Sequence, residues 1–139
     1  MADTVTLATL QQNDKRVVRS AIVQSDGTGG TALLVDVSGL AAHSSSGTAC
    51  STVGLQRLWF SCVTGDGQDS YARIDQEDSD ADIPILGLTG TGYWDFREFG
   101  GIKANTSSNS NEYDVNLVVP GQADSGNMYT VVAEFTKNY

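Results

Sequence analysis

The sequence predicts an all-β protein, an antiparallel β-sandwich of jelly-roll-like arrangement with about eight strands. Three observations lead to this fold class. β-branched and aromatic residues recur in short runs of alternating apolar and polar side chains, which is the pattern of half-buried strands. Clusters of Gly, Ser, Asn and Asp separate these runs. Finally, no segment shows the apolar spacing of a long helix.

The length and charge of the chain limit its organisation and its partners. We expect residues 1–139 to form a single domain, since 139 residues is the length of one domain. The net charge of -9 and the pI near 4.2 argue against nucleic acid and anionic membranes as partners, because both attract clusters of Lys and Arg. The first residues lack the basic start and apolar run of a signal peptide, so we expect synthesis in a cytoplasm without export.

The first three strands are expected within the first forty residues. Residues 2–10 alternate Thr with apolar side chains, and we interpret residues 1–12 as either an extended N-terminal arm or the first strand. Residues 15–23 form the next strand, whose two faces both carry apolar residues, as if a second sheet or a neighbouring subunit covered part of it. The Asp-Gly turn at 25–30 should close a hairpin with a returning strand at 33–38.

A long loop of small residues is expected at 39–51, and it contains His43, the only histidine. A Ser–His pair can supply a nucleophile and its base, but the base needs a third group that orients it. This loop offers no such group nearby in the sequence. We therefore expect a solvated histidine without catalytic function.

The clearest strand of the chain is expected at 52–64. Its side chains alternate between two faces, with Leu58, Phe60 and Cys62 on one and Arg57, Trp59 and Ser61 on the other. A strand at 69–74 should pair back with it across the turn at 65–67.

The run 75–82 is the most acidic part of the chain and could suggest a calcium loop. An EF-hand loop has Gly at its sixth position and Glu at its twelfth, whereas counting from Asp78 gives Ile83 and Thr89. We expect a solvated acidic loop and no metal-binding residues.

Residues 86–102 hold four aromatic residues between glycines: Tyr93, Trp94, Phe96 and Phe99. Glycines permit tight turns, and aromatic side chains bury the largest areas. We predict that this block fills the centre of the core. The glycine spacing is not a dinucleotide fingerprint, because no crossover helix follows.

The last two strands are predicted at 113–119 and 127–136, joined as a hairpin across the turn residues 120–126. In the final strand, alternate residues should share one face: Tyr129, Val131, Ala133 and Phe135.

The two cysteines, Cys50 and Cys62, are too far apart for a CxxC redox pair. With a single histidine they also cannot complete a structural zinc site. We expect buried free thiols, with a cross-strand disulfide as the alternative outside a reducing compartment. The sequence thus suggests no catalytic residues, no cofactor and no metal.

Short motifs along nearly the whole chain resemble those of a known family, and they lie at 16–23, 25–29, 35–40, 55–60, 90–96, 100–103 and 124–130, followed by a terminal strand. In their order they are similar to the small virion structural proteins of tailed bacteriophages. The chain departs from that family in the loop at 39–51, the acidic insert at 75–82 and its two cysteines.

The resemblance implies a capsid decoration (cement) protein without enzymatic activity. Such a protein would bind and stabilise the major capsid protein shell on the outer capsid surface, as a homotrimer. Other virion locations, namely the tail, the fibre base or the head–tail connector, remain alternatives.

Two further function classes follow from the residues alone. A carbohydrate-binding β-sandwich module would expose Tyr93, Trp94 and Phe96 for stacking on sugars. A glycosidase would need two carboxylates facing each other across a cleft, and Asp80 and Asp82 lie too close together in one loop to promise that.

Overall fold

The structure of this protein is a computed structural model, and it describes residues 4–24, 29–63, 71–79, 81–105, 111–119 and 128–139. No helix in these ranges is long and apolar enough to cross a membrane. They form eight strands and two short 3-10 turns: β1 (Thr4–Gln12), β2 (Arg16–Gln24), β3 (Gly30–Val35), η1 (Val37–Gly39), β4 (Thr52–Val63), β5 (Tyr71–Asp78), β6 (Ile83–Asp95), η2 (Arg97–Phe99), β7 (Asn111–Val119) and β8 (Met128–Asn138).

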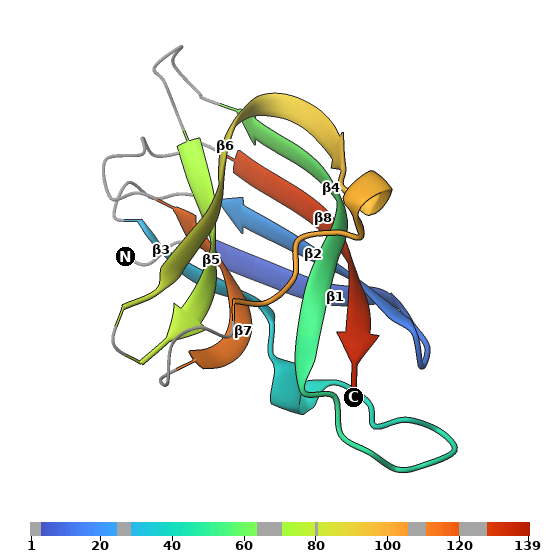
Figure 1. The fold of residues 1–139 in the computed structure, drawn as a ribbon. Coiled ribbons are helices and arrows are strands. Elements are labelled where there is room, and N and C mark those ends of the chain that lie inside the picture. Colours follow the sequence, from blue (N-terminus) through green and yellow to red (C-terminus); the bar gives the residue numbers. More distant parts are fainter. Residues whose placement is uncertain (1–3, 25–28, 64–70, 80, 106–110, 120–127) are drawn as a thin grey trace.

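All eight strands belong to one antiparallel sheet with the order β1-β2-β8-β4-β6-β5-β7-β3. Strand β6 joins two halves of this sheet, because its C-terminal part pairs with β4 and its N-terminal part pairs with β5. Figure 1 shows β6 arching from one half to the other. The sheet curls until β3 approaches β1 and β2, which makes it nearly closed and barrel-like. The predicted all-β antiparallel fold of about eight strands is therefore confirmed.

Residues 4–12, expected as an arm or a first strand, form β1 and pair with β2 along its length. The side chain of Asn13 fixes the turn between the two strands, since its Oδ1 accepts the backbone N–H groups of Lys15 and Arg16 at 2.8 and 2.9 Å.

The core lies inside the curled sheet and draws on both halves. Alternate residues of β4 and β8 point inward as the period-two pattern predicts, and all are buried: Leu58, Phe60, Cys62, Tyr129, Val131, Ala133 and Phe135. The other half contributes Leu34, Ile74, Leu88 and Leu117. Each large apolar side chain buried in this way contributes about 1.5–3 kcal/mol of hydrophobic stabilisation.

The prediction that residues 86–102 fill the centre of the core is wrong. Tyr93, Trp94 and Phe99 are 45%, 38% and 68% exposed. One glycine of this segment, Gly92, makes room for a ring from β4, because a Cβ at this position would lie 2.8 Å from Cζ of Phe60. Strand β6 thus contributes the side chain of Leu88 and the close-packed backbone at Gly92 to the core, whereas its aromatic residues Tyr93 and Trp94 stay near the surface.

Three predicted hairpins are also wrong. Both edges of β2 are occupied by β1 and β8, so β3 pairs with β7 instead. Strand β5 pairs with β6 and β7, and not with β4. Strand β8 pairs with β2 and β4, and not with β7. The turn residues at 25–28, 64–70 and 120–127 lie outside the described residues. Turn chemistry marks where a strand ends, whereas its partner is chosen by packing across the whole sheet.

The acidic run at 75–82 is not simply a solvated loop. Its first half belongs to β5, and Asp75 and Asp78 are buried there. Arg73 compensates the buried charge of Asp75 with two parallel hydrogen bonds, of 2.7 and 2.9 Å. This bidentate pair raises the pKa of the Arg73 guanidinium. Asp80 lies outside the described residues.

Candidate interaction surface

The outer face of β4 and β6, together with the η2 turn that follows β6, carries a group of aromatic and arginine side chains. We call it the aromatic–arginine surface and define it as Arg57, Trp59, Tyr93 and Arg97. The strand register places Trp59 opposite Tyr93, and their ring centroids lie 5.0 Å apart. The guanidinium carbon of Arg57 lies 5.1 Å from the centroid of Trp59, which is within cation–π range. Trp59 and Tyr93 both remain more than one-third exposed.

Asp95 anchors one side of this surface. Its carboxylate accepts two hydrogen bonds from the Arg97 guanidinium, at 2.7 and 2.9 Å, and one from the Arg97 backbone N–H at 3.0 Å. The Tyr93 hydroxyl donates to the same carboxylate at 3.4 Å. The bonds from Arg97 hold the pKa of Asp95 well below its usual range, and Asp95 in turn raises the pKa of Arg97.

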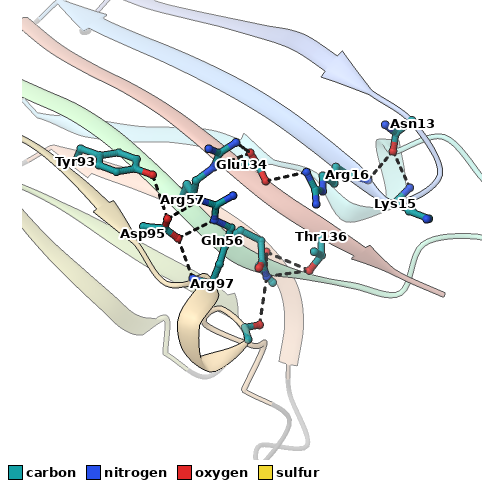
Figure 2. Close-up of polar contacts among 12 residues, drawn as sticks. Asn13, Lys15, Arg16, Gln56, Arg57, Tyr93, Asp95, Arg97, Glu134 and Thr136 are labelled. Carbon is teal, nitrogen blue, oxygen red and sulfur yellow. Dashed lines mark hydrogen bonds and ion pairs between the residues drawn. The ribbon is translucent and has the colours of Figure 1, made fainter.

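Glu134 anchors the other side from strand β8, where it is only 3% exposed. Arg57 donates to its Oε2 through Nε, at 3.0 Å, and also through Nη2. Arg16 of β2 lies 3.7 Å from Oε1. These hydrogen bonds, which Arg57 donates to Glu134, raise the pKa of the Arg57 guanidinium. Figure 2 shows the resulting line of polar and charged side chains from Tyr93 and Asp95 across to Arg16, which come from β6, β4, β8 and β2.

This arrangement is suited to binding a protein surface. Trp, Tyr and Arg are the residues that most often dominate the binding energy of protein interfaces. Their side chains are held by ion pairs and ring contacts, so a partner would lose little free energy in ordering them. Three guanidiniums (Arg16, Arg57 and Arg97) stand against two carboxylates here, in a chain whose net charge is -9.

The three aromatic residues that we considered for sugar stacking do not form one platform. Tyr93 packs on Trp59 at the outer face, whereas Trp94 points to the other face of β6, with ring-centroid distances of 5.4 Å to Phe60 and 6.0 Å to Phe96. The ring of Trp59 is in contact with both Tyr93 and Arg57.

His43 does have an acidic neighbour, which the sequence analysis missed. Asp14 lies 29 positions earlier in the chain, and its Oδ2 is 3.9 Å from Nε2 of His43. However, the Ser44 hydroxyl donates to the Asp14 carboxylate and not to the imidazole, and this bond lowers the pKa of Asp14. His43 Nδ1 accepts the backbone N–H of Ser45 at 3.2 Å. A nucleophilic relay requires a hydroxyl on the imidazole, and Ser44 does not supply it.

His43 is also less solvated than expected, because its ring packs edge-on against Tyr139 with a centroid distance of 5.1 Å. Nothing in the sequence pattern brings residues 14, 43 and 139 together, since they come from three different segments. Their proximity follows from the loop folding back onto the end of the sheet.

Both cysteines are buried and free, as predicted. They lie near opposite ends of β4. Cys62 pairs with Tyr129, near the start of β8. Cys50 comes two residues before Thr52, which pairs with Asn138 at the end of β8. Burial raises the pKa of the Cys62 thiol to about 11 and also raises the pKa of Cys50. Neither thiol is therefore poised to act as a nucleophile.

Within the described ranges, no group of three or more His, Cys, Asp and Glu side chains is arranged to hold a metal ion. Comparison with known proteins matches this chain to no family model and to no curated protein. The aromatic–arginine surface is thus the feature on which a functional proposal can be built.

Proposed function

We propose that this protein is a non-enzymatic structural protein of a tailed-phage virion, namely a capsid decoration (cement) protein that binds and stabilises the shell of major capsid protein. The resemblance of its short motifs suggests the class. The structural observation that supports the proposal is the aromatic–arginine surface. Its residue types are those that dominate protein interfaces, and ion pairs already hold its arginine side chains in place.

A decoration protein needs a stiff fold and a contact that can be repeated many times. Three residues of the aromatic–arginine surface, Arg57, Trp59 and Tyr93, lie on paired strands, which hold side chains more firmly than a loop would, and Asp95 holds Arg97 of the η2 turn. On a symmetric shell, linked copies would add their individual contacts, so a modest affinity per copy is sufficient. Strand β6 divides the sheet into two halves. As part of the proposal, these two halves pack face to face as a jelly-roll-like sandwich.

The test is the affinity of purified chain variants for shells assembled without this protein. Tyr93 and Tyr71 form a matched pair, since they are 45% and 47% exposed and lie on the different halves of the sheet. We expect Tyr93→Ala to weaken shell binding by about tenfold or more, the usual loss at an interface hot spot. Tyr71→Ala should bind like the wild type.

Two results would contradict different parts of the proposal: the binding surface, or shell binding itself. Equal binding by Tyr93→Ala and wild type would mean that the shell contacts another surface. Failure of the wild-type chain to bind shells would remove the decoration function itself.

A further inference from the structure

Strand β1 ends the sheet with an edge that lacks the usual protection. It pairs with β2 on one side, and its other edge is not part of any pairing among the described strands. Natural edge strands commonly carry charged side chains or Pro, which prevent pairing with other chains. Residues 4–12 contain neither. Unpaired backbone N–H and C=O groups along such an edge can bond to an added strand.

The inward-facing side chains of β1 are also uncovered. Val5 and Leu7 lie opposite Val23 and Ala21, which are buried, yet Val5 and Leu7 are 41% and 38% exposed. The inward apolar side chains of neighbouring strands therefore continue onto β1, where they become exposed to solvent. Covering this area would gain hydrophobic stabilisation.

The other end of the sheet, β3, is better protected. It is only six residues long, and its pairing with β7 is irregular between Leu33 and Val35. Arg19 of β2 reaches the Leu34 carbonyl of β3 with a 2.8 Å hydrogen bond and the Thr9 hydroxyl of β1 with a 2.5 Å hydrogen bond. This arginine links the two ends of the sheet through the Thr9 side chain, and among the described strands no backbone pairing joins β3 to the free edge of β1.

We propose that β1 pairs antiparallel with β1 of a second copy of this chain, around a two-fold axis at Leu7. The pairing of β1 with β2 is regular from Thr4 to Thr9 and shifts between Thr9 and Gln11, which limits the usable edge. A two-fold axis at Leu7 places Leu7 opposite itself, Val5 opposite Thr9, and Thr6 opposite Ala8. Every pair combines apolar or Thr side chains, which stabilise antiparallel strands when they face each other.

Charge selects β1 as the surface on which a second copy can bind. Each chain carries a net charge of -9, so two copies repel one another through most of their surfaces. Strand β1 is the longest described strand without an ionisable side chain, and two copies can meet along it without bringing like charges together. A basic partner would instead be drawn to the acidic surfaces elsewhere on the chain. This inference goes beyond the proposed function and does not depend on shell binding.

The proposal is tested by the mass in solution of the full chain and of charge variants at position 7. A two-fold axis at Leu7 brings two lysines together in Leu7→Lys and two aspartates together in Leu7→Asp. We expect a wild-type dimer, and a dimer affinity weakened by more than about tenfold in each variant. An equal mixture of the two variants should dimerise again, because opposite charges then face each other. Leu33→Lys is the matched control on β3, since Leu33 is 37% exposed, and it should remain a dimer.

A second variant tests the register without relying on charge. Leu7→Cys places two thiols opposite one another at a separation that a disulfide can bridge. It should form a covalent dimer on mild oxidation, whereas Leu33→Cys should not; the native thiols are buried.

A wild-type monomer at every soluble concentration, or the homotrimer that the family resemblance implies, would overturn the two-fold pairing. Loss of the dimer in Leu33→Lys but not in Leu7→Lys would also overturn it and assign the contact to β3. None of these results would affect shell binding by monomers, so the two proposals can fail separately.

Discussion

Strands β8 and β1 flank the same neighbour, β2, and both have the alternating sequence of a half-buried strand. Their surroundings are nevertheless opposite. The inward apolar residues of β8, from Tyr129 to Phe135, are at most 1% exposed, whereas Val5 and Leu7 of β1 are 41% and 38% exposed. Outside, β8 carries the buried Glu134, and β1 carries no charge. Strand β8 is thus a central, buried strand of the sheet, whereas β1 is an edge strand with exposed apolar side chains.

The difference shows that alternation identifies a strand and its faces but does not say what covers them. Burial of an inward face depends on strands from the opposite side of the curled sheet, which β8 has and β1 largely lacks. The uncovered strand is therefore the part of the fold where a second molecule can add stability. Substitutions in the two regions should separate these roles.

The largest effect is expected at the charged outer face of β8. Arg57→Met removes the close partner of the buried Glu134 carboxylate and should destabilise the protein by about 3 kcal/mol, the low end for a broken buried ion pair. Arg16→Met is the matched control, because Arg16 is more exposed and lies 3.7 Å from the same carboxylate; it should cost less than about 1 kcal/mol. Urea unfolding measures both. Equal losses would show that Arg57 has no special role in compensating Glu134.

A smaller effect is expected from trimming one inward valine in each strand. Val131→Ala in β8 should cost about 2 kcal/mol, because it removes two buried methyl groups and leaves a cavity. Val5→Ala in β1 should cost less than about 0.5 kcal/mol, as is usual for surface positions. Both are measured by denaturant unfolding in dilute solution, where β1 is unpaired. Equal costs would mean that β1 is covered within a single chain.

The smallest effect concerns the exposed ion pair of the aromatic–arginine surface. Arg97 lowers the pKa of Asp95 in the folded state, so the pair stabilises the fold above the usual aspartate pKa of about 3.9 and loses this contribution as the pH falls toward the lower folded pKa. Wild type should therefore melt at a higher temperature than Asp95→Asn at neutral pH, and the difference should shrink in acid. A difference that is constant with pH would contradict this assignment.

The sequence predicted the positions of most strands and the buried faces of β4 and β8, but not how the strands pair. The alternation at Leu58 to Cys62 and at Tyr129 to Phe135 identified core faces correctly, because side-chain direction follows from the local backbone. Pairing is a property of distant segments. Among the strands that the structure describes, only β1–β2 and β5–β6 pair as neighbours in sequence, so the expected hairpins were wrong elsewhere.

The candidate surface was predictable only in part. The period of two placed Trp59 and Arg57 on the same face of β4, but their neighbours Tyr93, Asp95 and Glu134 arrive from other strands. The burial of acidic side chains was predicted wrongly where one particular residue compensates the buried charge. Asp75 lies in an acidic run, yet it is buried because the side chain of Arg73 bonds to it. Aromatic residues beside glycines were mistaken for core, because composition does not show which ring occupies the space that a glycine leaves.

The central claim is that this chain is a structural component of a virion shell. Quantitative protein composition of purified particles from the source of the sequence tests it most directly, as copies of this chain per copy of major capsid protein. The account predicts a ratio near one or a simple symmetric fraction of it. A few copies per particle would instead indicate a tail or connector component and contradict shell decoration, and complete absence from the particles would contradict the virion function.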